Sequence, residues 1–395
     1  MRLTVISHSC VIDTNQQLFA ELEQLGVVLQ LIVPARWRGD LAGADVTPTR
    51  WEGLTARLTQ LPVVLSGNVP LHAYRASLGR QFYLFQPDAI YVENESYAVS
   101  TFQAALANRL SVRRPLLFRN NQNLLKRLPP PFASAERYVL DHAACANVVN
   151  EEAGQVLRAK GYRGRVAYMP YGVDTAFYHP VDARGLREQL GLRGMVFGYM
   201  GRLVQEKGVL DLIAAVERFH PEEEVSLLIV GNGPLEAEIR QRLAAPSLAG
   251  RARLLPAVPH REVPLYLSAM STLVLPSRTL PGWKEQFGRV VIEALACGVP
   301  VIGSDSGEIP HLLNRLQAGL IVPEGDVTAL HGAMRRLIEV PGKHDALREV
   351  GRREVEQQYA HTALAYRFHQ LLGAIVAERQ RGADDDAVPA WVQGD

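Results

Sequence analysis

The sequence predicts an α/β protein built from two Rossmann-like domains, each with a parallel sheet. The chain has 395 residues, which is more than a single hydrophobic core usually contains. Short runs rich in β-branched residues alternate with helical patterns along its whole length, as is typical of parallel sheets. A stretch rich in proline, glycine and aromatic residues near residues 172–190 interrupts this alternation, and we place the domain boundary there.

In the first half, each expected strand is a short apolar run that precedes a turn or a helical pattern. Strands are expected over residues 3–7, 28–33, 89–93, 116–119 and 147–150. Helices are expected over residues 16–25, 100–108, 132–142 and 151–160. The sequence therefore predicts an N-terminal domain over residues 1–175.

The second half repeats this alternation. Strands are expected over residues 196–200, 226–230, 252–255, 272–275, 300–303 and 319–322. Apolar residues at helical spacing predict a helix over 208–219. We expect a C-terminal domain over residues 176–360, a further helix over 361–380 and a flexible tail over 381–395.

Composition excludes several classes of protein. The net charge of +1 gives no overall field for a polyanion, and no basic-aromatic pattern indicates nucleic-acid binding. The three cysteines are far apart among apolar neighbours, which indicates buried thiols in a reducing cytoplasm. The first apolar run is too short for a signal peptide, and no run is long enough to span a bilayer. We expect a cytoplasmic protein, soluble or peripheral on the inner face of a membrane.

The most informative stretch is residues 281–300, which holds two carboxylates eight positions apart. The second lies in an apolar helical run, and the first lies just before that run. Eight residues are a little over two helical turns, so Glu285 and Glu293 can lie near one line along a helix face. Carboxylates accept hydrogen bonds, and sugars present rows of hydroxyl donors. Phe287 and Gly288 place backbone N–H groups at the start of the helix, where phosphate binds.

This stretch resembles the carboxylate-x7-carboxylate motif of family 4 (group 1) retaining glycosyltransferases. The resemblance implies the GT-B fold, in which two Rossmann-like domains face each other across a cleft. It also implies that the helix over 361–380 crosses back to the N-terminal domain. By the same resemblance, Glu293 binds the nucleotide ribose and Glu285 holds the hydroxyls of the transferred sugar. Donor-binding positions in this motif also include Gln286, Phe287, Gly288 and Arg289.

A second segment, Gly201 to Gly208, follows the strand expected over 196–200 and resembles the family's Gly-Arg-Leu…Glu-Lys-Gly motif. Ligands of α/β sheets bind beyond the carboxyl ends of strands. The resemblance implies that Arg202 and Lys207 bind the donor diphosphate, so we expect catalysis to depend on Arg202, Lys207 and Glu285. The turn with Gly231 and Gly233 and the loop with Val258 match further donor-site segments. No pair of acids is placed to hold a metal, so no metal and no cofactor is expected beside the nucleotide diphosphate sugar.

The acceptor half departs from the family pattern. The first strand is followed by Ser-His-Ser-Cys rather than a Gly-Gly turn, which makes His8 a candidate cleft residue. Asn121, Gln122 and Asn123 stand where many relatives have a histidine, and their amides can bind hydroxyls but cannot act as bases. A general base could be His8, Glu93 or Glu95, or the donor phosphate itself.

Residues 96–135 contain no acid, and their cations have two interpretations. They are either solvated separately or form a basic face that contacts anionic lipid or a phosphate-bearing acceptor. The candidate residues are Arg109, Arg113, Arg114, Lys126 and Arg127.

The prediction is a retaining, metal-independent glycosyltransferase that moves a sugar from a nucleotide diphosphate sugar to a hydroxyl of a glycan or lipid-linked acceptor. Such activity belongs to cell-envelope polysaccharide or glycolipid synthesis. Two alternatives stay open, a sugar-nucleotide epimerase of similar fold and a non-catalytic glycosyltransferase-like subunit. An epimerase would form product without an acceptor.

Overall fold

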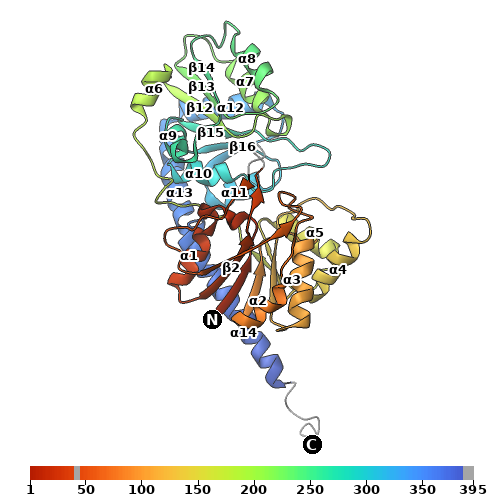
Figure 1. Ribbon diagram of the computed structural model, residues 1–395. Coiled ribbons are helices and arrows are strands. Elements are labelled where there is room, and N and C mark those ends of the chain that lie inside the picture. The colour runs from red at the N-terminus through yellow and green to blue at the C-terminus, as the bar shows by residue number, and fades with distance from the viewer. Residues whose placement is uncertain (40–44, 386–395) are drawn as a thin grey trace, which may run out of the picture. The chain divides into compact units, whose positions relative to one another are not determined.

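The computed structural model describes residues 1–39 and 45–385. These residues form two compact units, each with its own parallel sheet (Figure 1). Unit 1 comprises Met1–Pro170 together with the segment from His361 onward, and unit 2 comprises Tyr171–Ala360. Unit 1 is therefore built from two separate pieces of the chain, and unit 2 from one.

Unit 1 contains a seven-stranded sheet with the order β11-β10-β9-β8-β1-β2-β5. All neighbouring strands in it run parallel. The strands are β1 (Arg2–Ile6), β2 (Val28–Pro34), β5 (Arg57–Leu61), β8 (Ala89–Val92), β9 (Leu116–Asn120), β10 (Cys145–Val148) and β11 (Arg165–Tyr168). Two short antiparallel pairs join β3 (Trp37–Arg38) to β4 (Asp45–Val46) and β6 (Val63–Val64) to β7 (Ala73–Tyr74).

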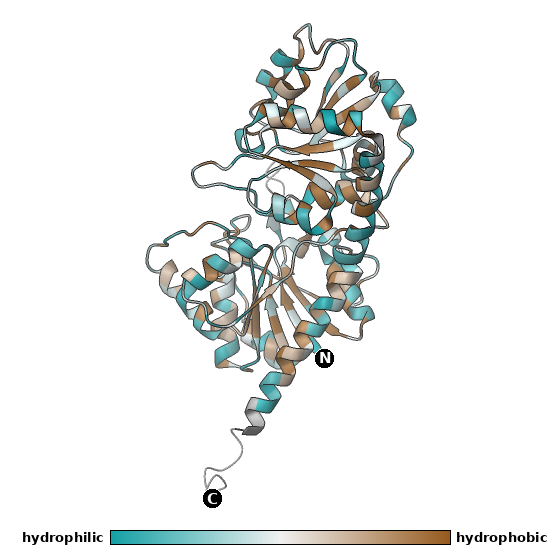
Figure 2. Ribbon diagram, turned by 180° about the vertical axis from the view of Figure 1, so that it is seen from behind, coloured by the Kyte–Doolittle hydropathy of each residue, from teal (hydrophilic) through white to brown (hydrophobic). Residues whose placement is uncertain are grey.

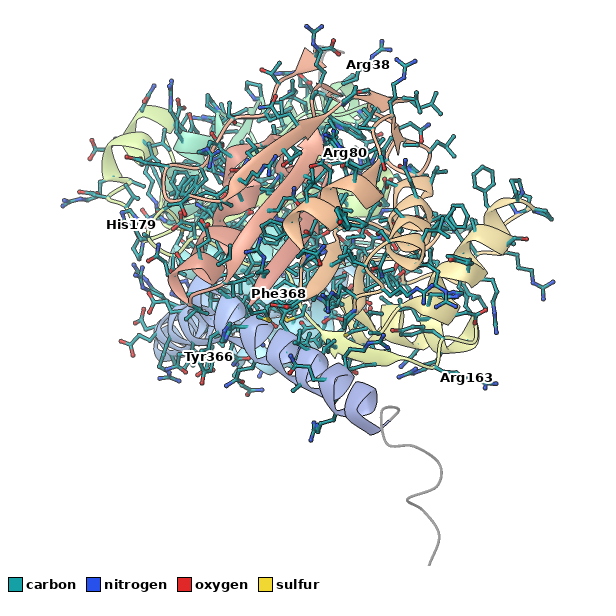
Figure 3. The ribbon with its side chains drawn as sticks, turned by 60° about the horizontal axis from the view of Figure 1, so that its bottom comes forward. Arg38, Arg80, Arg163, His179, Tyr366 and Phe368 are labelled. Atoms are coloured by element: carbon teal, nitrogen blue, oxygen red, sulfur yellow. The ribbon has the colours of Figure 1, made fainter. Side chains whose placement is uncertain are left out.

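Both faces of this sheet are buried, because successive side chains of a strand point to opposite sides. One face, with Tyr91, packs against α1 (Gln17–Gln24) and α14 (His361–Asp385). Phe368 of α14 is buried there, while Tyr366 on the same helix is 55% exposed (Figure 3). The other face, with Ile90, packs against the remaining helices of the unit. These are α2 (Leu78–Phe85), α3 (Val99–Leu110), α4 (Phe132–His142) and α5 (Glu151–Ala159). Short 3-10 helices η1 (Ser9–Val11) and η2 (Asp13–Gln16) follow β1.

Unit 2 contains a six-stranded sheet with the order β14-β13-β12-β15-β16-β17. Its strands also pair in parallel. They are β12 (Met195–Met200), β13 (Val225–Val230), β14 (Ala252–Leu255), β15 (Thr272–Leu275), β16 (Val301–Ser304) and β17 (Gly319–Val322).

Helices cover this second sheet, and its strands are apolar where they pass through the core (Figure 2). The helices are α6 (Arg184–Leu190), α7 (Val209–Val216), α8 (Glu236–Leu243), α9 (Val263–Ser268), α10 (Arg289–Ala296), α11 (Ile309–Leu316), α12 (Val327–Glu339) and α13 (Pro341–Gln358). Two 3-10 turns, η3 (Gln205–Lys207) and η4 (His260–Glu262), precede α7 and α9. Cys10, Cys145 and Cys297 are free and buried, as predicted.

Most predicted elements are present, with local differences in their bounds. The strand predicted over 147–150 begins at Cys145 and ends before Asn150, because the Asn150 side chain caps α5 by accepting from the Ala153 N–H. The helix predicted from residue 208 begins at Val209, because Gly208 has a left-handed φ of 65°. The sequence did not predict β5, β11 or α2. The helix predicted over 361–380 continues to Asp385, and the last ten residues of the predicted tail, 386–395, lie outside the described part.

Candidate functional site

The site predicted for the donor lies in unit 2, at the carboxyl ends of adjacent parallel strands (Figure 1). The loop after β12 carries Arg202 and Lys207, and the loop after β13 carries Gly231 and Gly233. This edge is where α/β sheets bind ligands.

The loops after β12 and β13 touch through their backbones. The Leu203 N–H donates to the Asn232 carbonyl over 2.9 Å, and the Gly201 N–H donates to the Val230 carbonyl over 3.0 Å. A Cβ atom on Gly231 would lie 1.8 Å from the Gly201 carbonyl oxygen. A Cβ on Gly233 would lie 2.4 Å from the Leu203 carbonyl oxygen. Only glycine fits at both positions, so this turn holds the Arg202 loop in place.

Two of the three residues predicted to be catalytic are in direct contact. Lys207 Nζ lies 2.5 Å from Glu285 Oε2, although 78 positions separate them in the sequence. The Ser277 hydroxyl donates to the same carboxylate oxygen over 3.0 Å. The Lys207 ammonium also lies 5.1 Å from the centre of the Trp283 ring. The Glu285 side chain is only 7% exposed and the Lys207 side chain 21%, so the pair is largely enclosed.

Backbone contacts fix Glu285 further. Its carbonyl accepts from the Glu308 N–H over 3.2 Å, and a Cβ on Gly307 would lie 1.9 Å from that carbonyl oxygen. The third predicted catalytic residue, Arg202, is exposed, and within the described residues its side chain forms no ion pair. Its backbone carbonyl accepts from the Tyr199 hydroxyl over 2.6 Å. The site thus combines an enclosed carboxylate–ammonium pair with an exposed guanidinium on the same loop as the ammonium.

An ion pair between Arg278 and Asp211 also restrains the loop that carries Lys207. Arg278 makes two hydrogen bonds with the Asp211 carboxylate, and its Nε–Oδ2 distance is 2.7 Å. The Arg278 backbone N–H donates to the Glu206 carbonyl over 2.8 Å. Planar two-point pairing of this kind is rigid as well as strong, so Arg278 restrains the segment that presents Lys207.

The structure confirms that Glu285 lies just before the helix that carries Glu293, and the two carboxylates therefore do not share one helix face. The helix α10 begins at Arg289, and Gly288 has a left-handed φ of 78° immediately before it. Glu285 therefore lies in the preceding loop, and only Glu293 lies on the helix. Buried Phe287 anchors this loop, with ring-centre distances of 5.4 Å to Tyr171 and 6.2 Å to Tyr359. Gln286 and Arg289 are both exposed on either side of Phe287 and Gly288.

Glu293 lies in a more apolar setting. Its side chain is 17% exposed, and burial raises the pKa of the carboxyl, an effect that nearby Arg289 partly offsets. The Arg289 Nε lies 4.0 Å from Glu293 Oε1. Burial, followed by the charge of Glu293, raises the pKa of Tyr178. The Tyr178 hydroxyl lies 3.2 Å from His260 Nε2. His260 begins the turn that follows Val258. Tyr178 is therefore a neighbour of both Glu293, the predicted ribose ligand, and the segment predicted to lie against the nucleobase.

The sequence analysis missed three neighbours of this site. Ser277 lies eight residues before Glu285, and Trp283 lies within the stretch 281–300. Tyr178 was interpreted as linker because proline and glycine surround it. Their aromatic or hydroxyl character beside the motifs is the signal that could have identified them.

The predicted acceptor residues lie in unit 1, in two groups. His8 follows β1, and its ring centre is 5.1 Å from that of Trp37 and 5.5 Å from that of His72. Burial, followed by His72, lowers the pKa of His8 to about 4. His8 is therefore neutral near pH 7.

The amides after β9 form the second group, and they are tied to the framework. The Asn121 N–H donates to Glu95 Oε1 over 2.9 Å, and the Asn123 side chain donates to Glu152 over 3.2 Å. Gln122 and Asn123 are 9% and 4% exposed. Burial raises the pKa of Glu95 to about 7, against the opposing effect of the Asn121 N–H. Of His8 and Glu95, Glu95 has the pKa nearer to neutrality.

The predicted basic face divides into two groups. Arg109, Arg113 and Arg114 precede β9, whereas Lys126 and Arg127 follow it. The strand lies between them, so the five cations gather at opposite ends of β9 instead of forming one surface.

The described residues contain neither a cluster of metal ligands nor a helix that could span a membrane. Among residues 1–39 and 45–385, no three His, Cys, Asp or Glu side chains gather in an arrangement that could hold a metal ion. None of the described helices combines the length and apolar composition needed to cross a membrane.

The segment that carries the donor-site motifs matches a known protein family. Residues 186–354 match the family model described as Glycosyl transferases group 1, and this range contains Arg202, Lys207, Glu285 and Glu293. The C-terminal unit is a group 1 glycosyltransferase domain. The group 1 assignment predicted from the two motifs is thereby confirmed for unit 2.

The chain is similar to enzymes with different acceptors. It is 28% identical to the 2-deoxystreptamine glucosyltransferase of Streptomyces kanamyceticus, over 69% of this chain and 68% of that protein. It is 31% identical to the GDP-mannose-dependent monoacylated alpha-(1-6)-phosphatidylinositol monomannoside mannosyltransferase of Corynebacterium glutamicum, over 52% of this chain and 55% of that protein. The matches thus span about two thirds and about half of these relatives.

A solved structure shows the fold over nearly the whole chain. HepE from Anabaena, in complex with UDP, superposes with a TM-score of 0.72 at 18% identity, over 95% of this chain and 100% of that chain. The chain therefore has the predicted GT-B fold.

Proposed function

We propose that this protein is a retaining, metal-independent glycosyltransferase of family 4. It transfers a sugar from a nucleoside diphosphate sugar to a hydroxyl of a glycan or lipid-linked acceptor. The observation that carries the proposal is the contact between Lys207 and Glu285, with the exposed Arg202 on the same loop as Lys207. In a nucleoside diphosphate sugar, the anionic diphosphate is bonded directly to a sugar with several hydroxyls. A cation next to a carboxylate can bind both parts, because the cation pairs with the diphosphate and the carboxylate accepts hydrogen bonds from the hydroxyls.

Each part of the donor has a matching group in unit 2. Arg202 and Lys207 bind the diphosphate and offset the charge that develops on it as the sugar leaves. Glu285 accepts hydrogen bonds from the sugar, and Glu293 accepts them from the ribose. The segment around Val258, next to His260 and Tyr178, lies against the nucleobase. Unit 1 holds the acceptor.

In the proposed reaction, the bond between the anomeric carbon and the phosphate oxygen breaks. The acceptor oxygen forms the new bond on the same face of the sugar, and the acceptor proton passes to a phosphate oxygen. Lys207 has three N–H donors, so it can keep one contact with Glu285 while it binds the diphosphate. We expect the contact with Glu285 to hold the ammonium near the leaving group.

A ligand panel tests the donor site directly. The full chain is heated with UDP, GDP, ADP or CMP, each in EDTA and in magnesium. A ligand at a hundred times its Kd should stabilise the protein by roughly 3 kcal/mol, which is visible as a higher Tm. A shift in EDTA with one nucleoside diphosphate supports a metal-free donor site. A shift that needs magnesium refutes metal independence, and no shift with any ligand favours the non-catalytic subunit.

A second measurement separates transfer from epimerisation. The sugar nucleotide conjugate of the base that binds is incubated with the protein, with and without candidate acceptors. Transfer requires the acceptor and releases nucleoside diphosphate, whereas a new sugar nucleotide formed without acceptor identifies an epimerase. The anomeric configuration of the product, measured by NMR, decides whether the reaction is retaining.

A further inference from the structure

Unit 1 contains a pocket that the donor and acceptor predictions do not use. Its volume is about 490 Å³, and it lies at the amino ends of β9, β10 and β11. The predicted acceptor residues follow the carboxyl ends of β1 and β9, so the pocket is at the opposite edge of the sheet. Figure 3 shows the molecule from this end. The loop with Arg163 leads into β11, and α14 passes close to it, since Glu378 of α14 pairs with Arg165.

Arginine dominates the charge of this pocket. The five that line it come from α3, the loop before β9, β11 and α14; they are Arg109, Arg113, Arg114, Arg165 and Arg379. Two carboxylates also line it, and both are engaged. Asp141 pairs with Arg137 over 2.9 Å, and Glu378 pairs with Arg165 over 2.5 Å.

Four guanidinium groups are therefore left to face the pocket without an acid. Within the described side chains, no ion pair involves Arg109, Arg113, Arg114 or Arg379. All four are exposed, so a ligand from solution can reach them. An arginine fork matches two oxygens of one phosphate group.

The loop that presents two of these arginines is rigidly built. The buried Asn108 side chain donates to the Arg114 carbonyl and accepts from the Arg114 N–H, each over 2.8 Å. The Arg113 N–H donates to the Asn108 carbonyl over 2.9 Å. Arg113 has a φ of 53°, a left-handed conformation that is strained for a residue with a Cβ atom. Asn108 thus fixes Arg114 through its buried side chain and holds Arg113, in its unfavourable backbone conformation, through its carbonyl.

Helix capping does not account for so many arginines. The carboxyl ends of α3 and α4 reach the pocket, and each carries about half a negative charge that attracts a cation. Two helix ends supply roughly one negative charge in total. Five arginines against two carboxylates leave a formal charge of three positive, so a net positive potential remains.

We propose that this pocket binds the phosphate group of an anionic ligand. The ligand is either a free phosphate-bearing molecule or the headgroup of an anionic lipid, because both present the same oxygens to the arginines. The site is separate from the donor site and does not depend on the proposed transfer reaction.

The test compares two double variants of the full chain that lose the same charge. Arg109→Gln/Arg114→Gln removes two pocket arginines, and Lys126→Gln/Arg127→Gln removes two exposed cations at the other end of β9. Binding of inorganic pyrophosphate is measured by calorimetry with UDP present at a saturating concentration to occupy the donor site. Flotation with phosphatidylcholine vesicles, with or without phosphatidylglycerol, tests the lipid source.

The pocket variant should bind pyrophosphate or phosphatidylglycerol vesicles at least about tenfold more weakly than the parent, while the control variant binds normally. Loss of pyrophosphate binding alone identifies a free ligand, and loss of vesicle binding alone identifies a lipid. Unchanged Tm values show that both variants fold. Equal losses in both variants, no loss in the pocket variant, or no binding of either probe by the parent would overturn the proposal.

Discussion

Replacing Lys207 by methionine tests whether the central ion pair serves structure, ligand binding or both. Methionine keeps most of the side-chain length but leaves the Glu285 carboxylate, which is 7% exposed, without its ammonium partner. Breaking a fully buried pair costs about 3–5 kcal/mol. Lys207 is 21% exposed and Ser277 still donates to the carboxylate, so we expect a smaller loss of about 2 kcal/mol in the free energy of unfolding.

The double variant Lys207→Met/Glu285→Gln separates the two roles. The neutral amide removes the stranded charge, so most of the lost stability should return. Nucleotide binding should not return, because the cation for the diphosphate is still missing. A lost charge-assisted hydrogen bond of about 1.5–3 kcal/mol corresponds to a tenfold to hundredfold weaker Kd.

Urea unfolding and calorimetry with the nucleoside diphosphate that stabilises the parent measure these two quantities. The Glu285→Gln variant alone is the control, since it keeps Lys207 and frees its ammonium. If Lys207→Met lost stability yet bound the nucleotide within twofold of the parent, Lys207 would be only a structural partner of Glu285.

Three further predictions concern other residues described above. Gly231→Ala should unfold at least about 2 kcal/mol more easily in urea, because its Cβ would lie 1.8 Å from the Gly201 carbonyl oxygen; unchanged stability would show that the loop can move. Glu293→Gln should weaken nucleoside diphosphate binding in calorimetry without lowering Tm, whereas an effect on turnover alone would contradict a ribose contact. Burial raises the pKa of Glu95 from 4.5 to about 7, so this group binds more protons in the folded state between those values, and its contribution to stability falls as pH rises through that window. Between pH 5 and pH 8, the free energy of unfolding should therefore fall by up to roughly 3 kcal/mol less in Glu95→Gln than in the parent. A variant with the parent's pH dependence would refute the assignment.

How far the fold could be predicted depended on where each strand lies in its sheet. The strands β15 and β16 are buried throughout and were evident as apolar runs. The two strands of the seven-stranded sheet that were missed, β5 and β11, are its edges. Arg57 to Leu61 and Arg165 to Tyr168 have exposed or half-buried residues at most positions, so neither segment has the continuous apolar run that identifies an interior strand.

The site was predictable as a set of motifs but not as a set of contacts. Local patterns identified the loops after β12 and β13, since a glycine-rich turn after an apolar strand has a clear signature. The contact between Lys207 and Glu285 joins loops 78 residues apart, and only the strand order brings them together. The position of Glu285 before the helix was predictable, because Gly288 stands directly before the apolar run that forms α10.

The return of the chain to unit 1 has a consequence for biosynthesis. A ribosome makes the strands of unit 1 first and α14 only after all of unit 2. Until then, the sheet face that includes Tyr91 lacks the helix whose Phe368 ring lies 5.1 Å away. The nascent unit 1 therefore exposes an apolar surface while some 190 residues of unit 2 are still being translated, a period in which a chaperone that binds apolar surfaces has a defined target on this chain.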